Sequence, residues 1–256
     1  MTRPSPNAQP GSHADTPRTI ETYRSADSQR TSDRFAVQVV PGERSERVSR
    51  FVNVAIAATA LIVLSPLLIV LGLLVRLTSR GPVFYTQTRV GLDRRQTRLN
   101  ALYDRRTDDL GGRAFLIYKF RTMRVDAEAA TGAVWATKSD PRVTLLGRVL
   151  RKTRLDELPQ LINVLRGDMN IVGPRPERPS IFARLRRDIA DYPLRQLAKP
   201  GITGWAQINH DYDQTIDDVR TKVRYDLEYI QRQSLGEDLK IMLKTFPVIL
   251  FRKGGW

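Results

Sequence analysis

A run of 25 residues without a charge, residues 51–75, constrains this chain more than any other feature. At about 1.5 Å per residue, a helix over this run is long enough to cross the hydrocarbon core of a membrane. Ser65 and Pro66 stand at its centre. Proline removes one backbone donor and collides with the carbonyl of Ile62, so we expect a kink or a break there. The Ser65 hydroxyl can then bond back to the carbonyl of Leu61.

The sequence leaves the topology of this segment open between two forms. The segment begins too far from residue 1, and lacks a small-residue cleavage site, to be an ordinary signal peptide. Arginines flank it equally, with Arg44, Arg47 and Arg50 before it and Arg76, Arg80 and Arg89 after it. Because the positive-inside bias is balanced, a re-entrant hairpin with both ends on the cytoplasmic face fits at least as well as a spanning helix. Length alone favours the span.

Composition divides the chain into three parts. Residues 1–50 are rich in Pro, Ser, Thr and Arg and bury little apolar surface, so we expect a disordered arm. Within it, the run 35–40 could pair as a strand, but Pro41 and Gly42 close it at once. Residues 51–78 are expected to form the membrane-embedded part and residues 79–256 a cytoplasmic domain.

Hydrophobic periodicity predicts an α+β domain that is mostly helical. A strand is expected over 114–122, where Lys119 and Arg121 share one face. Helices are expected over 144–152, from Leu161 to a stop at Gly167, over 181–189 and 219–230, and over 239–250 with an interruption at Pro247. Helices that carry both basic and large apolar residues suit the surface of an anionic bilayer, but the same stripes could simply form the core.

Composition also excludes several kinds of chemistry. The chain has no Cys and two His, so it holds no disulfide, no thiol nucleophile and no multi-histidine metal site. Carboxylate chemistry remains. Its 42 basic and 27 acidic residues give a net charge of +15, and the excess lies mainly in residues 81–256. Such a charge suits nucleic acid, anionic lipid headgroups or phosphorylated substrates.

The densest group of chemically capable residues begins with Asp156 and Glu157. Pro159 is tolerated in a first helical turn, so the acidic pair is expected at the N-terminus of the helix that contains Leu161. There the free N–H groups and the helix dipole stabilise anions. The two carboxylates could converge on one metal ion or one phosphate, although an acidic pair before a helix is more often only a cap.

Arg175 strengthens the interpretation of a phosphate site. Pro174 and Pro176 restrict the backbone on both sides of it, so its guanidinium is presented from a stiff segment. A preorganised guanidinium is well suited to bind phosphate with two hydrogen bonds. Lys119 and Arg121 could add charge to the same pocket. Taken singly, each of these cations could also be a solvated surface residue.

Three long motifs occur in a fixed order: IYKFRTM over 117–123, GRVLRKTRLDELPQLINVLRGDMNIVGPRPERP over 147–179, and KPGITGWAQI over 199–208. With them, the region from residue 51 to the C-terminus resembles the bacterial sugar transferases called monotopic phosphoglycosyl transferases, which are polyprenyl-phosphate glycosyl-1-phosphate transferases. The resemblance implies that the 51–75 segment is a re-entrant helix broken at Ser65 and Pro66. It places the protein at the cytoplasmic face of the bacterial inner membrane, among membrane lipids.

The resemblance also implies site residues and ligands. Asp156 and Glu157 match the catalytic acidic pair, which we also expect to meet Mg²⁺. Lys119 and Arg175 match residues of the phosphate site, to which we add Arg121 and Arg178. The implied donor is a nucleotide-diphosphate sugar, usually a UDP-sugar, and the acceptor is undecaprenyl phosphate. No nucleic acid is expected, and a homodimer is left open. The stretch 92–114 is longer than in the family, and residues 1–50 match nothing in it.

The implied reaction has two steps and starts exopolysaccharide or other glycan assembly. Asp156 attacks the β-phosphorus, releases UMP and forms an aspartyl phosphosugar, and undecaprenyl phosphate then takes the sugar phosphate. Glu157 either binds the metal or positions the nucleophile. A membrane-tethered nucleic-acid binder would explain the charge, but no recognition motif is present. A catalytically silent scaffold of a polysaccharide assembly complex would not need both carboxylates.

Overall fold

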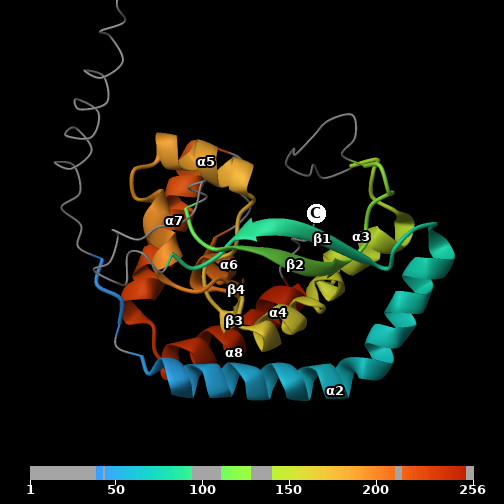
Figure 1. Ribbon diagram of the computed structural model, residues 1–256, viewed down its shortest axis with the longest axis horizontal. Coiled ribbons are helices and arrows are strands. Elements are labelled where there is room, and N and C mark those ends of the chain that lie inside the picture. The colour runs from blue at the N-terminus through green and yellow to red at the C-terminus, as the bar shows by residue number, and fades with distance from the viewer. Residues whose placement is uncertain (1–38, 43, 94–110, 128–139, 211–214, 252–256) are drawn as a thin grey trace, which may run out of the picture. The chain divides into compact units, whose positions relative to one another are not determined.

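The computed structural model describes residues 39–42, 44–93, 111–127, 140–210 and 215–251. Figure 1 shows their arrangement. The elements are α2 (Glu46–Thr78), β1 (Phe84–Val90), β2 (Ala114–Phe120), α3 (Leu145–Lys152), η2 (Leu155–Glu157), α4 (Gln160–Arg166), β3 (Asn170–Val172), α5 (Pro179–Asp188), η3 (Tyr192–Leu197), β4 (Gly201–Thr203), α6 (Trp205–Asn209), α7 (Ile216–Arg232) and α8 (Leu235–Phe251). The fold is therefore mixed and mostly helical, as predicted.

The long helix α2 begins earlier than the uncharged run. The Ser45 side chain caps it by accepting a hydrogen bond from the Val48 N–H at 3.5 Å, and the helix starts at Glu46. Just before it, Arg44 forms an ion pair with Asp238 of α8 at 2.7 Å. The expectation of a disordered arm over 1–50 is therefore wrong for its last residues, because a cap and an ion pair order them. Residues 1–38 lie outside the described part, as does most of the candidate strand 35–40.

Pro66 lies inside α2, which is assigned as one helix. Figure 1 shows that its ribbon changes direction in the C-terminal half, as a kink at proline predicts. The Ser65 hydroxyl donates to the carbonyl of Ile62 at 2.8 Å rather than to that of Leu61. This choice is physically sensible, because the Ile62 carbonyl is the one that loses its N–H donor to proline. The helix is long and apolar enough to cross a membrane.

Two small sheets set the frame of the domain. β1 and β2 pair antiparallel, with Phe84 opposite Phe120 and Val90 opposite Ala114. Asn163 of α4 extends this ladder, because its side chain accepts from the Tyr118 N–H at 3.0 Å and donates to the Leu116 carbonyl at 2.7 Å. The predicted strand over 114–122 thus exists but ends at residue 120.

The second sheet joins segments that are distant in the sequence. β3 and β4 pair in parallel, with Asn170 opposite Gly201. Their backbones meet closely at two glycines: a Cβ on Gly173 would lie 2.2 Å from the Lys199 carbonyl oxygen, and one on Gly201 would lie 2.1 Å from the Gly173 nitrogen. Only glycine fits at either position.

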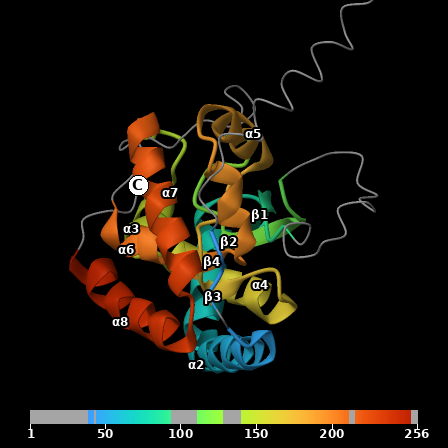
Figure 2. The same ribbon diagram turned by 90° about the vertical axis from the view of Figure 1, so that its left-hand side faces the viewer.

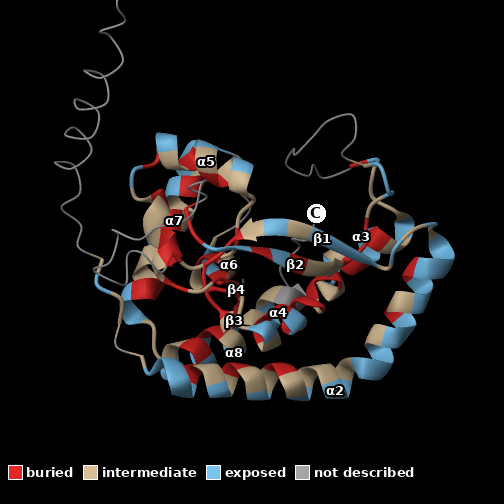
Figure 3. Ribbon diagram, in the orientation of Figure 1, coloured by how far each residue is buried: buried red, intermediate tan, exposed pale blue. Residues whose placement is uncertain are grey.

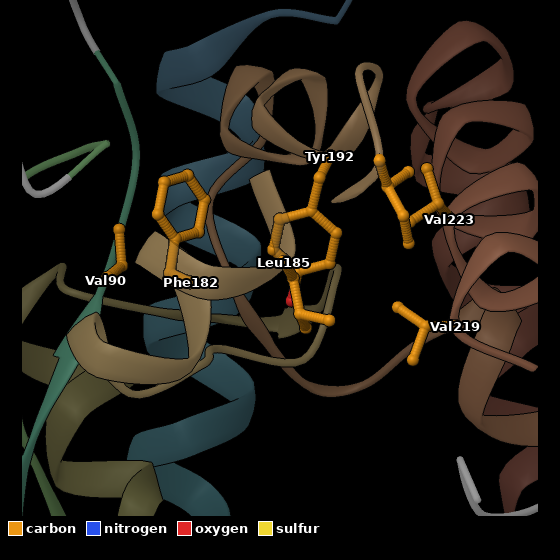
Figure 4. Close-up of a cluster of buried hydrophobic side chains, with 7 residues drawn as sticks. Val90, Phe182, Leu185, Tyr192, Val219 and Val223 are labelled. Carbon is orange, nitrogen blue, oxygen red and sulfur yellow. The ribbon is translucent and has the colours of Figure 1, made fainter. Parts of the chain in front are cut away.

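The helical stripes divide between core and surface. Phe182, Leu185, Val219 and Val223 of α5 and α7 are buried against one another, as Figure 4 shows, so these two stripes form core. By contrast, α3 and α8 leave large apolar residues exposed (Figure 3): Leu145, Val149, Leu239, Leu243 and Phe246. In the two views of Figures 1 and 2, α8 and the N-terminal half of α2 lie at one end of the domain and α5 at the other.

Candidate active site

A tight connection between α3 and α4 presents the acidic pair. Arg154 has a φ of 59°, in the left-handed region, and is the one described non-glycine residue with a positive φ. It connects α3 to η2. Asp156 and Glu157 follow in this short helix and are buried, with 6% and 7% of their surface exposed. The pair therefore lies directly before α4, close to the predicted position at the start of that helix but not within its first turn.

Glu157 is the centre of a cluster of cations. Its Oε1 atom lies 2.7 Å from Lys119 Nζ and 2.5 Å from Arg175 Nη2, and its Oε2 atom lies 3.3 Å from Arg175 Nη1. Arg154 adds a longer ion pair at 4.0 Å. Burial favours the protonated carboxyl, but Arg175 and Lys119 outweigh it and hold the pKa of Glu157 well below its ordinary value. Glu157 is thus an ionised carboxylate with its oxygens already bound.

Asp156 differs from its neighbour. Within the described part of the chain, its carboxylate makes no hydrogen bond and no ion pair within 4 Å. Burial and the negative charge of Glu157 raise the pKa of Asp156 to about 6, against the opposing charges of Lys119, Arg151 and Arg175. At neutral pH the group is mostly ionised and is less stabilised than an ordinary aspartate. Such a carboxylate is available to react or to bind an incoming group.

The structure brings together only some of the predicted phosphate-binding residues. Lys119, on β2, and Arg175, after β3, both reach Glu157. Arg121 does not join them, because β2 ends at Phe120 and the strand alternation no longer applies. Its Nη2 atom instead donates to the Ser79 carbonyl at 2.6 Å and to the Ser79 hydroxyl at 2.7 Å, at the end of α2. Arg121 therefore links the C-terminal end of α2 to the end of β2.

Arg178 lies at the N-terminal cap of α5, where its carbonyl accepts from the Phe182 N–H at 2.9 Å. Burial lowers the pKa of Arg89, and the charges of Arg175 and Arg178 lower it further. Arg178 is thus near the cations of the site. Across the described segments, no group of three or more His, Asp or Glu residues could by itself hold a metal ion.

Sequence reasoning missed several residues that shape the site. Gln207 of α6 accepts a hydrogen bond from Arg175 Nη1 at 3.2 Å, and it lies within the KPGITGWAQI motif, which was the available signal. Arg151 of α3 is held by a 2.9 Å hydrogen bond from its Nε to the Thr122 hydroxyl, and its charge acts on Asp156. Arg195 donates to the Arg175 carbonyl at 3.0 Å. No spacing rule indicates that last contact.

Comparison with known protein sequences shows which family this chain resembles. The sequence model of a family described as bacterial sugar transferase matches residues 44–252. The chain belongs to the bacterial sugar transferase family. The resemblance stated from its motifs is therefore confirmed.

Several members of the family share about two fifths of their aligned residues with this chain. A UDP-N-acetylgalactosamine-undecaprenyl-phosphate N-acetylgalactosaminephosphotransferase of Aeromonas hydrophila is 40% identical over 79% of this chain and 44% of its own length. A UDP-glucose:undecaprenyl-phosphate glucose-1-phosphate transferase of Escherichia coli (strain K12) is 41% identical over 77% of this chain and 39% of its own length. A transferase of the same name from Caulobacter vibrioides is 39% identical over 78% of this chain and 69% of its own length. The chain thus spans less than half the length of the first two of these bacterial sugar transferases.

Proposed function

We propose that this chain transfers a sugar 1-phosphate from a UDP-sugar to undecaprenyl phosphate through a covalent intermediate on Asp156. The observation that carries the proposal is the contrast within the acidic pair: Glu157 is bound by Lys119 and Arg175, whereas Asp156 is buried, ionisable and without a bonded partner among the described residues. The names of relatives that match over most of this chain support the same reaction class.

Asp156 would act as the nucleophile. One of its carboxylate oxygens bonds to the β-phosphorus of the donor, the bond from that phosphorus to the bridging oxygen breaks, and UMP leaves. A phosphate oxygen of undecaprenyl phosphate then bonds to the same phosphorus, and the bond to Asp156 breaks and restores the carboxylate. Neither nucleophile is a hydroxyl, so neither step needs a general base, which suits a site without a described histidine among its contacts.

The surrounding cations would bind and orient the diphosphate. Arg175 and Lys119 already converge on Glu157, so the carboxylate holds both side chains in place before the donor arrives. Preorganised cations stabilise the charge that develops on transferring phosphoryl oxygens without the cost of reorganisation. Glu157 would then be a positioning residue, one of the two roles that the sequence left open.

The contacts of the two carboxylates favour Asp156 over Glu157 as the residue that would bind Mg²⁺. Mg²⁺ is usually bound by one or two carboxylates together with substrate phosphates, which fits a carboxylate that is not engaged by protein cations. Both oxygens of Glu157 face lysine or arginine nitrogens and so are poorly placed for a second cation. When bound, Mg²⁺ would neutralise the diphosphate and stabilise the departing UMP.

We also propose that α2 enters and leaves the membrane on the cytoplasmic side. Near its start, Arg50 donates to the carbonyls of Val164 and Leu165 at the end of α4. Near its end, Leu71 and Val75 pack against Phe120 and Leu150 of the same domain (the latter two on β2 and α3).

Asn53 adds a further contact near the start of α2, because its Oδ1 atom accepts from the Ile171 N–H at 2.6 Å. A straight span would place the two ends of α2 on opposite sides of a core about 30 Å thick, where one domain on one side cannot contact both. The bend in the C-terminal half of α2, the half that contains Pro66, is compatible with the re-entrant form.

The covalent step is tested by labelling. Detergent-solubilised protein is given UDP-sugars labelled with ³²P in the β-phosphate, without acceptor, and both UMP release and retained label are measured. Asp156→Asn keeps the shape but removes the nucleophile, so label should vanish and turnover should fall by more than about 10⁴-fold. Asp217→Asn is the matched control, because Asp217 has a side chain 86% exposed on α7. Retained label in Asp156→Asn would refute the covalent role, and release of UMP from no donor would favour a silent scaffold.

The topology is tested with single cysteines in a chain that has none of its own. Ser45→Cys and Thr86→Cys, at exposed positions on either side of α2, are challenged in intact cells with a membrane-impermeant thiol reagent. The re-entrant form predicts that both cysteines stay protected and that both react once the membrane is opened. Reaction at position 45 but not at position 86 in intact cells would mean that α2 spans the bilayer.

A further inference from the structure

The backbone that carries Arg175 is held in an unusual way. Pro174 and Pro176 have no N–H groups, so the backbone of each can be hydrogen-bonded only through its carbonyl. The Pro174 carbonyl accepts from the Gly201 N–H at 3.0 Å, and the Glu177 carbonyl accepts from the Val90 N–H at 2.9 Å. The two carbonyls between them are bound by side chains.

Those side chains are two arginines from different parts of the fold. Arg195 of η3 donates from Nη2 to the Arg175 carbonyl at 3.0 Å. Arg89 of β1 donates from Nη1 to the Pro176 carbonyl at 3.1 Å. We call the two arginines and the two carbonyls the carbonyl clamp. The clamp joins the segment after β3 to β1, which precedes it in the sequence, and to η3, which follows it.

Arg195 is built into its position. It is 1% exposed, its Nε donates to Asp226 at 2.6 Å, and its Nη1 donates to the Tyr192 hydroxyl at 2.8 Å. Each of its three guanidinium nitrogens therefore has an acceptor, one of which is the Arg175 carbonyl. Burial disfavours the charge, but Asp226 outweighs it and raises the pKa of Arg195. A lysine could keep the ion pair but could not make this set of contacts.

Arg89 is held by a second acidic residue. Glu177 lies 3.9 Å from Arg89 Nη1 and 2.9 Å from Lys222 Nζ, and its side chain is mostly buried. Arg89 of β1 thus lies near Arg175 and Arg178 of the segment, and the like charges of the three arginines repel. The carboxylates of Glu157 and Glu177 offset this repulsion.

We propose that Arg195 and Arg89 are positioning residues. By binding the backbone carbonyls of Arg175 and Pro176, they direct the Arg175 guanidinium toward the reacting phosphate. Their effect on sugar-phosphate transfer rests on the proposed function, whereas their effect on Arg175 itself does not. A guanidinium displaced by about 1 Å from its productive position costs about 10²-fold in rate. Loss of either arginine should therefore lower the donor kcat/KM on that scale while the protein remains folded.

The test uses Arg89→Met, which removes one donor and keeps an apolar stem, and Arg195→Lys, which keeps the charge opposite Asp226. Lys222→Met is the matched control, because Lys222 is about as buried as Arg89 and binds the Glu177 carboxylate but neither clamped carbonyl. Donor kcat/KM is measured in the wild-type chain and again with Arg175→Gln, and thermal melting followed by circular dichroism confirms folding.

If the clamp acts through Arg175, both variants lose about 10²-fold in the wild-type chain and almost nothing more when Arg175→Gln is present. An equal loss in both backgrounds would overturn the proposal, because it would indicate a merely structural role. Lys222→Met should change kcat/KM much less in either background. If Arg195→Lys does not fold, Arg89→Met decides alone.

A second readout does not depend on activity. Phenylglyoxal modifies accessible arginines, and its rate at Arg175 is followed by mass spectrometry of the full chain. Arg89→Met and Arg195→Lys should speed modification of Arg175 several-fold, and Lys222→Met should not. An unchanged rate at Arg175 in both clamp variants would overturn the proposal. If the wild-type chain releases UMP from no donor, the proposed function fails and this readout still decides the clamp.

Discussion

Asp156 and Asp226 are both buried aspartates, with 6% and 2% of their surface exposed, yet they occupy opposite electrostatic situations. Asp226 lies 2.6 Å from Arg195 and forms a closed ion pair in the interior. Asp156 lies beside the ionised Glu157 and has no bonded partner in the described part of the chain. Burial alone therefore does not decide whether a carboxylate stabilises this fold. Its partners do, and the aspartate without a bonded partner among the described residues is the one in the proposed active site.

The largest expected effect on stability is at the paired aspartate. Asp226→Asn leaves Arg195 charged and buried without its partner, so the free energy of unfolding should fall by about 3–5 kcal/mol. Chemical denaturation of the full chain in detergent measures this loss. Asp217→Asn, at an exposed position, should change the free energy by no more than about 0.5 kcal/mol. A loss at Asp226 no larger than that of the control would show that the ion pair contributes nothing.

The same change at the unpaired aspartate should have the opposite sign. The pKa of Asp156 is about 6 in the folded chain, against an ordinary value of 3.8, so the folded chain holds this proton more tightly. Stability from this group is complete below pH 3.8 and is lost as the pH rises through 6. Asp156→Asn escapes that loss and should be more stable than the wild type by about 1–3 kcal/mol above pH 7.

That difference should shrink as the pH falls toward 4.5, which melting temperatures of the two proteins between pH 4.5 and 8 would show. A variant that is less stable than the wild type at pH 8 would contradict the comparison. The outcome separates stability from activity, since Asp156→Asn is expected to be inactive.

A smaller effect should appear in the pH dependence of the first half-reaction. Only the ionised Asp156 can attack, so UMP release without acceptor should be constant above pH 7 and fall about tenfold per pH unit well below pH 6. Measuring without undecaprenyl phosphate removes the titration of the acceptor from the profile. A rate that stays flat from pH 5 to 8 would mean that Asp156 is not the group whose ionisation limits the step.

Much of the fold could be predicted from local patterns. The helix that contains Leu161 ends at Gly167, whose φ of 86° suits glycine, and the strand and helices elsewhere follow their hydrophobic periods. β1 was missed although its residues, FYTQTRV, favour a strand. β3 and β4 have three residues each, and they form only because the folded chain brings them together.

The sequence predicted which residues make up the candidate site but not which of them would bind one another. The motifs identified Asp156, Glu157, Lys119 and Arg175 by residue type and order. They could not show that Glu157 takes both cations, since this depends on where β2 and the segment after β3 meet. Arg121 shows the limit of alternation, which fails one residue beyond the end of the strand.

The glycine contacts between β3 and β4 have a consequence for protein engineering. Gly173 and Gly201 touch through backbone atoms alone, so neither side of this contact can adapt to a changed partner by repacking side chains. The segment that carries Arg175 and the KPGITG segment therefore form one unit, although 27 residues separate their glycines in the sequence. A chimera with another sugar transferase should exchange both segments together, because exchanging either one alone would join two backbones shaped for different neighbours.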